Sequence, residues 1–501
     1  MRKTWLAGLV GALALTGCAS LPRHVHKTRS QALPDPGRTS LGRLVAAHSE
    51  PNLSGVRLLA SGDEALASLV ALADHAERTL DIQYYIIQQD DSARILLQHV
   101  REAANRGVRV RLLVDDLNTA GEDRRFMHLG QLTHMEVRVF NPFPGGRSAL
   151  WSRILATVSE IPRINHRMHN KLLVADNALA ITGGRNIGDQ YFTRDKVNNF
   201  IDLDVVAAGG IVVQLSASFD AFWNSKYAYP ISAIAAPVSD ESVPRVLADL
   251  EDPQAAWLAR ALDSSSLPLE WVPASVLADR PAKIISDNIA DSEETIANDI
   301  AALMRSAQAE VIIISPYFVP GKAGVELMRE LRARGVHIRI LTNSLASTDS
   351  ALVHKGYSRY RAALLKLGVD LEEVRPKLGV KRPRFHPFRS ANARLHAKAV
   401  VIDQKTVFIG SLNMDARSAR TNSELGLVIR SAEIAGQVTS LLDDISADGS
   451  YKLEWDALAG RIRWQSGEPG SVHTWFTEPE TSFLQRFALK VFAPFAPEEL
   501  L

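Results

Sequence analysis

The sequence predicts an α/β fold of two similar halves, each a mixed β-sheet flanked by helices, with a pseudo-twofold axis between them and the active site at their interface. Two observations support this prediction: a strand–helix–strand pattern occurs twice, and each occurrence is followed by the same short polar motif. Strand–helix–strand units build parallel or mixed sheets that helices cover. Residues 56–225 and 293–480 are the predicted halves, and residues 226–292, which have little strand pattern, are predicted to connect them.

Each copy of the pattern consists of an apolar strand, a helix, a glycine turn and a second strand rich in β-branched residues. The first copy uses residues 77–86, Ser92–Asn105, Gly107 and 108–115, and the second uses residues 310–319, Ala323–Ala333, Gly335 and 336–343. The offset is 233 from Glu77 to Glu310 and 228 from Gly107 to Gly335. This spacing is too long for a solenoid and indicates two large repeated units.

Composition excludes several classes of protein. The chain has 501 residues, of which 46% are hydrophobic, so it can form more than one domain with a large core and is not a wholly disordered chain. The 57 Lys and Arg residues nearly balance the 56 Asp and Glu residues, which leaves a net charge of +1. This balance argues against a protein that coats nucleic acid by bulk charge, so we expect no nucleic-acid partner.

The N-terminus has the pattern of a secretory signal that ends in a lipid-attachment site. Arg2 and Lys3 precede a short apolar run over residues 5–15, and the Leu-Thr-Gly-Cys string at residues 15–18 resembles a bacterial lipobox. We expect residues 1–17 to be removed and Cys18, the single cysteine, to be lipidated. Residues 18–55, rich in Pro, Ser, Arg and His, are expected to form a tether. The alternative is an ordinary buried cysteine after a chance apolar run.

The polar motif that ends each copy carries the predicted chemistry. It consists of His169, Lys171, Asp176 and Asn186 in the first copy and of His396, Lys398, Asp403 and Asn413 in the second. The offset is 227 at all four positions. A single H-x-K-x4-D string is a weak signal, but its duplication at a constant offset, each time with the same following Asn, is specific.

These residue types suit the transfer of a phosphate ester. His and Lys two positions apart on a strand point to the same face. Imidazole can act as a nucleophile or carry a proton, whereas Lys and Asn can hold phosphate oxygens. Two facing copies would place two His on opposite sides of one phosphorus, so that one attacks while the other protonates the leaving alcohol. Two Lys and two Asn supply the charge and the donors, so we expect neither a metal nor a cofactor.

Four carboxylates accompany the motifs. Asp202 and Glu424 are predicted to orient the histidines by bonding their second ring nitrogen, and the alternative is surface or strand-end charge. Asp176 and Asp403 belong to the motif, and with it to the candidate catalytic set. Both lie at apparent strand-to-strand turns, where a structural role through backbone hydrogen bonds is favoured.

The duplicated motif resembles the phospholipase D superfamily, and the strings around it are most similar to the bacterial cardiolipin synthases of C type. These strings include residues 81–86, 167–171, 183–189, 317–320, 341–346 and 353–357. The resemblance implies phosphatidyl transfer through a phosphohistidine, with His169 as the nucleophile and His396 as the acid and base, although the residues alone do not separate these roles. It also implies phosphatidylglycerol and a second phospholipid, phosphatidylethanolamine in the C type, as substrates from a phospholipid membrane.

Three alternative functions remain open at this stage. A hydrolase of the same superfamily would use the same residues with water as the acceptor and release phosphatidic acid. A nuclease of the superfamily is disfavoured by the neutral net charge and the predicted lipid anchor. A non-catalytic, membrane-tethered lipoprotein is disfavoured because both His-Lys pairs are intact.

The two ends of the chain suggest where the protein resides. A lipobox predicts a lipoprotein of a Gram-negative bacterium whose active site faces the periplasm. Ala19, after Cys18, is not the Asp that retains many lipoproteins in the inner membrane, so the outer membrane is favoured. Residues 481–501 are predicted to include an amphipathic helix, with Phe483, Phe487 and Val491 on one face. This helix could lie in a membrane surface or pack on the protein's own core.

Overall fold

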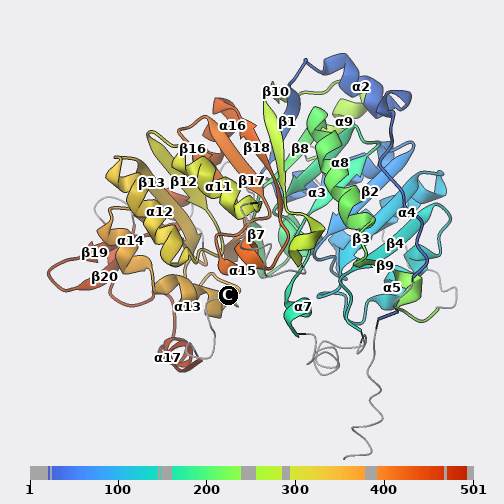
Figure 1. Ribbon diagram of the computed structural model, residues 1–501. Coiled ribbons are helices and arrows are strands. Elements are labelled where there is room, and N and C mark those ends of the chain that lie inside the picture. Colours follow the sequence, from blue (N-terminus) through green and yellow to red (C-terminus); the bar gives the residue numbers. More distant parts are fainter. Residues whose placement is uncertain are drawn as a thin grey trace, which may run out of the picture.

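Two β-sheets, each flanked by helices, stand side by side in the computed structural model (Figure 1). The structure describes residues 21–22, 25–144, 147, 161–237, 255–284, 294–377, 392–467 and 471–492. The predicted signal peptide 1–17, Cys18 and residues 493–501 lie outside the described residues. The α/β fold predicted from the sequence is confirmed.

The first sheet has nine strands in the order β10-β1-β8-β6-β5-β2-β3-β4-β9. The strands β2, β3 and β4 are parallel, and the other neighbours are antiparallel. Their bounds are β1 Ser54–Leu59, β2 Thr79–Tyr84, β3 Arg109–Asp115, β4 Met135–Phe140, β5 Leu172–Ala175, β6 Leu179–Gly183, β8 Asp204–Gly209, β9 Ala228–Pro230 and β10 Glu270–Val272.

The second sheet has ten strands in the order β11-β18-β17-β16-β12-β13-β14-β19-β20-β21, with β12, β13 and β14 parallel. Their bounds are β11 Ala274–Ala278, β12 Glu310–Ile314, β13 His337–Asn343, β14 Asp370–Val374, β16 Ala399–Ile402, β17 Thr406–Gly410, β18 Leu425–Arg430, β19 Ser450–Asp456, β20 Arg461–Ser466 and β21 His473–Trp475. The central orders β8-β6-β5-β2-β3-β4 and β18-β17-β16-β12-β13-β14 match strand for strand, as the internal repeat predicted. Strands β9, β10 and β11 fall within residues 226–292, where the sequence showed little strand pattern.

Helices cover both sheets, and several begin at a side chain that caps the first turn. Asp90 accepts a hydrogen bond from the backbone of Ala93 at the start of α4, and Ser431 accepts one from Ile434 at the start of α16. Within the described residues, the helices of five or more residues are α2 Ser40–His48, α3 Gly62–His75, α4 Asp91–Asn105, α5 Asp123–Gly130, α7 Ile161–Asn165, α8 Gly210–Trp223, α9 Trp257–Asp263, α11 Ile296–Arg305, α12 Gly321–Ala333, α13 Ala351–Ser358, α14 Arg361–Lys366, α15 Ala416–Arg420, α16 Ala432–Asp448 and α17 Phe483–Phe492.

The pairing register corrects one detail of the predicted repeat. Asp176 accepts hydrogen bonds from the backbone N–H groups of residues 77–79, and Asp403 accepts them from residues 308–310. Thr79 is therefore the counterpart of Glu310, an offset of 231. The repeat in the sequence pairs Glu77 with Glu310 at an offset of 233, which is wrong by two residues. Two like residues in an apolar stretch do not define register, whereas hydrogen bonds to the motif aspartates do.

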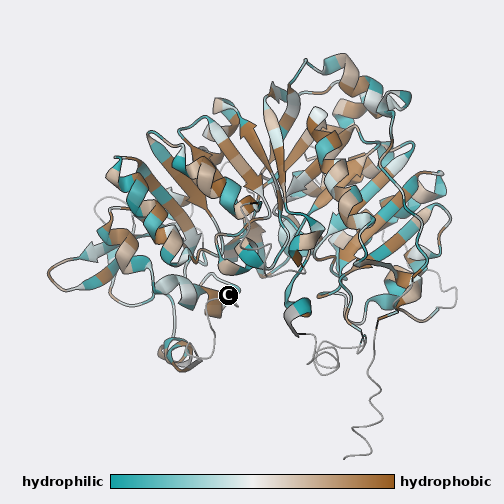
Figure 2. Ribbon diagram, in the orientation of Figure 1, coloured by the Kyte–Doolittle hydropathy of each residue, from teal (hydrophilic) through white to brown (hydrophobic). Residues whose placement is uncertain are grey.

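Three hydrophobic clusters hold the layers together. One lies between the first sheet and α3, α4 and α5, and another lies between the second sheet and α11, α12 and α14. The third is shared by both halves and contains the inner faces of both sheets together with α8 and α16. Figure 2 shows the matching pattern of apolar strands and striped helices. The two halves thus share one core.

The backbone also joins the halves, and two of these connections involve strands. Strand β10 at the edge of the first sheet and β11 at the edge of the second are separated only by Pro273. Strand β7 (Asn198–Ile201) of the first half pairs in parallel with β15 (Asn392–Leu395) of the second. The β7–β15 pair ends directly before Asp202 and His396, so it positions candidate site residues of both halves.

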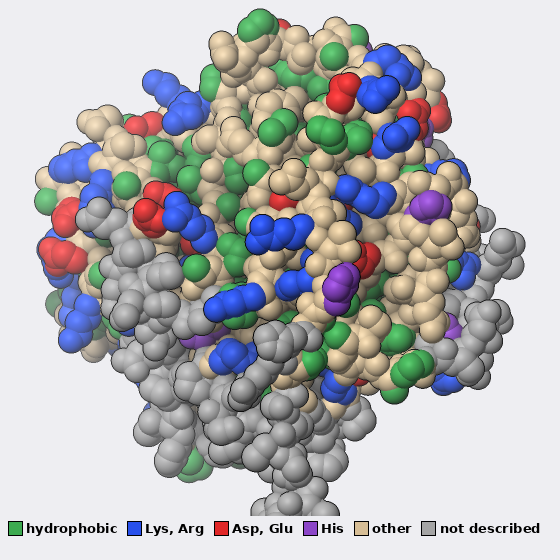
Figure 3. Space-filling view, turned by 45° about the vertical axis from the view of Figure 1, so that its right-hand side comes forward, with side chains coloured by type: hydrophobic (Ala, Val, Ile, Leu, Met, Phe, Trp, Pro, Cys, Tyr) green, Lys and Arg blue, Asp and Glu red, His purple; other side chains and the backbone are tan. Residues whose placement is uncertain are grey.

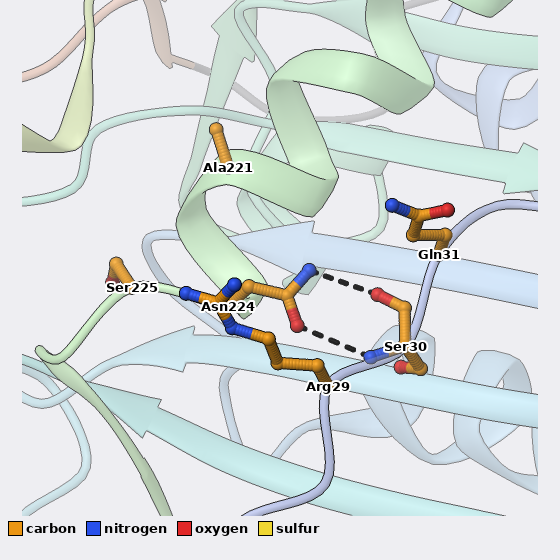
Figure 4. Close-up of a pocket in the computed structure, with 6 residues that line it drawn as sticks. All are labelled: Arg29, Ser30, Gln31, Ala221, Asn224 and Ser225. Atoms are coloured by element: carbon orange, nitrogen blue, oxygen red, sulfur yellow. Dashed lines mark hydrogen bonds between the residues drawn. The ribbon is translucent and has the colours of Figure 1, made fainter.

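The N-terminal segment 25–34, predicted as part of a tether, is bonded along the first half. Lys27 Nζ donates to the carbonyl of Ala228 at 2.8 Å, and Ala32 N donates to Asp220 Oδ2 at 2.8 Å. Asn224 exchanges two hydrogen bonds with Ser30 beside a surface hollow of about 580 Å³ (Figure 4). We call residues 25–34 the N-terminal strap.

Surface charge is unevenly spread, although the chain is nearly neutral. Figure 3 shows Lys and Arg side chains gathered in the middle of one face of the molecule. Within the described residues, no helix is both long enough and apolar enough to cross a bilayer.

The aspartates of the two motifs lie in hairpin turns. Asp176 and Asn177 have φ values of 53° and 51°, and Asp403 and Gln404 have φ values of 50° and 52°. Two consecutive residues with positive φ are characteristic of the tight turns that join antiparallel strands. Each carboxylate also accepts three backbone N–H groups at 2.8–2.9 Å from the chain that enters β2 or β12.

We expect Asp176→Ala to lower the free energy of unfolding by about 3 kcal/mol, because it leaves three backbone donors without their acceptor. Urea denaturation measures this change. Asp403→Ala is the matched control, and its effect should be smaller because Asp403 is less buried. A variant of normal stability that has lost all activity would instead indicate a chemical role for Asp176.

Candidate active site

The first candidate histidine is oriented by a carboxylate of the opposite half. His169 Nδ1 lies 2.9 Å from Glu424 Oε2, and both side chains are buried. The backbone fixes this pairing, because His169 N donates to Ser423 O at 2.9 Å and Ser423 N donates to Arg167 O at 2.9 Å. A carboxylate on Nδ1 leaves Nε2 as the ring nitrogen available for chemistry.

The second candidate histidine repeats this arrangement in the reverse direction. His396 Nδ1 lies 2.5 Å from Asp202 Oδ2, and His396 N donates to Ile201 O at 2.8 Å. Each motif therefore takes its orienting carboxylate from the other half. The sequence suggested Asp202 and Glu424 as orienting groups but did not indicate this exchange, because partners 194 and 255 residues apart meet only through the tertiary fold.

Burial determines the protonation of both imidazoles. It lowers the pKa of His169 to about 4, although Glu424 acts in the opposite direction. Burial and the charge of Lys398 lower the pKa of His396 to about 4, against the effect of Asp202. Both imidazoles are therefore neutral at pH 7. Burial alone would raise the pKa of Asp202 and Glu424, but the cations and hydrogen bonds around them lower both pKa values, so these carboxylates stay charged.

The two lysines lie beside the histidines. Lys171 Nζ donates to His169 O at 2.6 Å, and Lys398 Nζ lies 2.7 Å from His396 Nδ1 and 3.1 Å from its Nε2. Burial lowers the pKa of Lys171 and lowers that of Lys398 to about 8. The charge of each lysine acts on the histidine of the other half, which places the four side chains in one electrostatic environment.

The carboxylates differ in what surrounds them. Glu424 accepts hydrogen bonds from the hydroxyls of Ser411 and Ser418. In the first half, the counterpart of Ser411 at the offset of 227 is Gly184, and a Cβ there would lie 2.0 Å from Asp202 Oδ1. A serine therefore cannot occupy position 184 unless Asp202 moves. The charge of Lys398 dominates around Asp202 instead.

The two motif asparagines also have different surroundings. Asn186 Nδ2 donates to the Tyr191 hydroxyl at 2.9 Å, and its Oδ1 accepts from Ile86 N at 3.3 Å. Asn413 Oδ1 is buried and has no hydrogen-bond partner among the residues that the structure describes. The side-chain amide of Asn413 thus has fewer hydrogen bonds within the described residues than that of Asn186.

Sequence reasoning missed the aromatic side chains that hold the imidazoles. Tyr85 packs edge-to-face on His169 with a centroid distance of 4.9 Å, and Tyr191 packs in the same way on His396 at 5.1 Å. Phe200 also lies against His396 at 4.9 Å. The position of Tyr85 directly after β2, at the carboxyl end of a parallel strand, was the available signal.

The structure therefore brings His169, Lys171, Glu424, His396, Lys398 and Asp202 together and keeps Asp176 and Asp403 in the hairpin turns. Two neutral imidazoles with oriented rings and two lysines can bind an anionic ester and exchange protons with it. This chemistry needs both halves, because neither half holds a histidine together with its carboxylate.

Comparisons with known proteins show which family and fold the chain resembles. Residues 69–223 and 300–445 match the family model described as "Cardiolipin synthase, PLD-like domain". Cardiolipin synthase C of Escherichia coli (strain K12) is 37% identical over 470 residues, which cover 90% of this chain and 97% of the relative. An uncharacterized protein of Helicobacter pylori (strain ATCC 700392 / 26695) is 32% identical over 505 residues, or 97% of each chain. The crystal structure of phosphatidylserine synthase from Haemophilus influenzae Rd KW20 shares the fold, with a TM-score of 0.57, 14% identity, and coverage of 89% of this chain and 95% of that one.

The pKa of Lys398, about 8, predicts how anion binding depends on pH. Lys398 is charged below this pH, so we expect sulfate affinity to fall as pH rises through about 8. Lys398→Arg should move this loss to higher pH, because a guanidinium keeps its charge above pH 12. Isothermal titration calorimetry with sulfate measures both curves. If the two curves coincide, another group controls the binding.

Proposed function

Since this chain belongs to the PLD-like family of the cardiolipin synthases, we propose that it is a phosphatidyltransferase that makes cardiolipin from phosphatidylglycerol and a second phospholipid. The second phospholipid is phosphatidylethanolamine or another phosphatidylglycerol. The observation that carries this proposal is the exchange of carboxylates, which orients one imidazole from each half in a shared buried site.

In the first step, Nε2 of His169 attacks the phosphorus of the donor phospholipid. A P–N bond forms, the bond from phosphorus to the headgroup oxygen breaks, and the departing alcohol takes a proton from His396. Lys171 and Lys398 offset the charge on the phosphoryl oxygens, and Asn186 and Asn413 are the proposed amide donors to them.

In the second step, the roles of the histidines are reversed. His396 takes the proton from a headgroup hydroxyl of phosphatidylglycerol, and that oxygen attacks the phosphohistidine. The P–N bond breaks, His169 is restored, and cardiolipin leaves. The pKa of about 4 suits His169 as a neutral nucleophile in the free enzyme. His396 must gain its proton as the substrate binds, when the phosphate anion raises its pKa.

A phospholipase D hydrolase is the second candidate function, because it needs the same residues and differs only in the acceptor. The exposed fractions of His169 and His396 are only 8% and 6%, and a site shielded from bulk water during turnover would favour transfer to a lipid hydroxyl. A non-catalytic lipoprotein would not need two oriented histidines, and we consider it the weakest alternative.

We expect the chain from Ala19 to Leu501 to form cardiolipin from phosphatidylglycerol vesicles, and mass spectrometry of the lipids detects it. His169→Ala should lower the rate by a factor on the order of 10³ or more, because it removes the nucleophile. His48→Ala, a substitution at an exposed histidine, is the matched control. Added phosphatidylethanolamine tests the donor. Phosphatidic acid without cardiolipin would show a hydrolase and refute the proposed transfer.

We further propose that Cys18 is the lipid anchor of a Gram-negative lipoprotein that faces the periplasm, on the outer rather than the inner membrane. The lipobox supports the anchor, and Ala19 supports the choice of membrane. Two or more acyl chains on one residue give stable attachment to a bilayer.

Radiolabelled palmitate should label the wild-type chain in a Gram-negative host, whereas Cys18→Ala should stay unlabelled because it lacks the acceptor thiol. Density-gradient separation of the two membranes then locates the wild-type protein. An unlabelled wild-type chain would contradict the anchor, and labelled protein in the inner-membrane fraction would contradict the location.

A further inference from the structure

We propose that α17 is a membrane-docking helix, whose apolar face enters the surface of an anionic phospholipid bilayer and holds the active site against it. This inference rests on the proposed function, because it explains how a buried site reaches phospholipids. It adds a surface and an orientation that the reaction itself does not specify.

Four apolar side chains of α17 face solvent. Phe483, Leu484, Phe487 and Val491 are 75%, 72%, 53% and 46% exposed. Phe483, Phe487 and Val491 follow one another at intervals of four residues, so they lie on one face of the helix. The sequence left two environments open for this helix, a membrane surface and the protein core. These four side chains do not lie in the protein core. An exposed apolar stripe on a short helix is typical of segments that lie in a membrane interface.

Basic residues flank the apolar face of α17. Arg486 and Lys490 belong to the helix, and the helix contains no acidic residue. A bilayer that contains phosphatidylglycerol has a negative surface, and each Lys or Arg near such a surface adds about 1 kcal/mol of attraction. This charge favours an anionic bilayer as the partner.

Buried ion pairs fix α17 to the active-site side of the second half. Glu478, just before the helix, bonds Arg361 at 2.5 Å, and Arg361 also pairs with Glu373 at 2.8 Å and contacts His354 at 2.6 Å. His354 belongs to α13, which contacts α17. The segment that leads into α17 is therefore bonded to the second half, and α17 itself contacts α13.

Helix α13 in turn borders the site. Asp349, two residues before α13, accepts a hydrogen bond from the Tyr317 hydroxyl at 2.7 Å. The charge of Asp349 also acts on Lys398. A bilayer in contact with α17 would thus lie next to the same end of the molecule as the site.

The N-terminal strap provides a second attachment at this end. In Figure 1, the strap begins low in the view, at the level of α7 and α13, and α17 also lies at the lower edge. Only seven residue steps separate Cys18 from Val25, where the strap begins. An extended chain of that length spans at most about 25 Å. A lipid anchor at Cys18 would therefore hold this same end of the molecule close to the bilayer.

The chain from Ala19 to Leu501 contains no cysteine, so one introduced cysteine gives a unique labelling site. We would attach an environment-sensitive fluorophore to Leu484→Cys on α17 and, as a control, to Val213→Cys on α8. Val213 is 55% exposed and lies near the start of α8, whereas the strap begins near the other end of this helix. Vesicles of phosphatidylglycerol and phosphatidylcholine should shift the emission at position 484 to shorter wavelength and leave position 213 unchanged. Equal responses at both positions would overturn the proposal.

A second experiment separates docking from catalysis. Phe483→Glu combined with Phe487→Glu should weaken vesicle binding in flotation by about tenfold or more, because two apolar anchors are lost. Turnover of vesicles should fall with it, while turnover of monomeric dihexanoyl phosphatidylglycerol should stay at the wild-type level. Val213→Glu should change neither. If the double variant binds vesicles like the wild type, α17 is not the docking helix. If the wild type binds vesicles but processes neither lipid form, docking stands and the proposed function fails.

Discussion

The exchange of histidine–carboxylate pairs between the halves is the constraint on which the rest of the structure depends. A buried carboxylate without a hydrogen-bond or charge partner destabilises the fold, and so does a buried imidazole without a hydrogen-bond partner. Glu424 and Asp202 each bond a histidine of the other half. The β7–β15 pair, the bridge between Met168 and Ser423, and the shared core all keep the halves in the one arrangement where both pairs form.

The sequence predicted the features that repeat and missed those that depend on long-range contacts. The two α/β halves, the helix ending at Asn105 and the glycine turns at 107 and 335 followed from local pattern, because periodicity and positive φ are properties of short segments. The constant offset of the motifs identified His169 and His396 as a pair. The crossing of their carboxylates could not be predicted, because it depends on which strand ends meet at the interface. Tyr85 was missed for a similar reason, since an aromatic residue at a strand end does not indicate which ring it will contact.

The two halves are similar in fold but not equivalent in chemistry. At the offset of 227, Tyr191 corresponds to Ser418 and Gly184 to Ser411. Glu424 is thus stabilised by two hydroxyl groups, whereas the charge of Lys398 stabilises Asp202. The two histidines therefore have the same side chain in different surroundings. The proposed two-step reaction would give the two imidazoles different tasks, and these two positions are where the surroundings of the imidazoles differ.

The single residue between β10 and β11 has a consequence for how large substrates reach this interior. Pro273 joins the two edge strands directly, and Val272 and Ala274 on either side of it pack against the shared core, which disfavours a hinge at this edge. In the proposed reaction, the phospholipids would then reach the histidines without the sheets parting at this edge. The proposed two-step transfer suits this arrangement, because the phosphatidyl group would stay on His169 while the second phospholipid takes the place of the released headgroup.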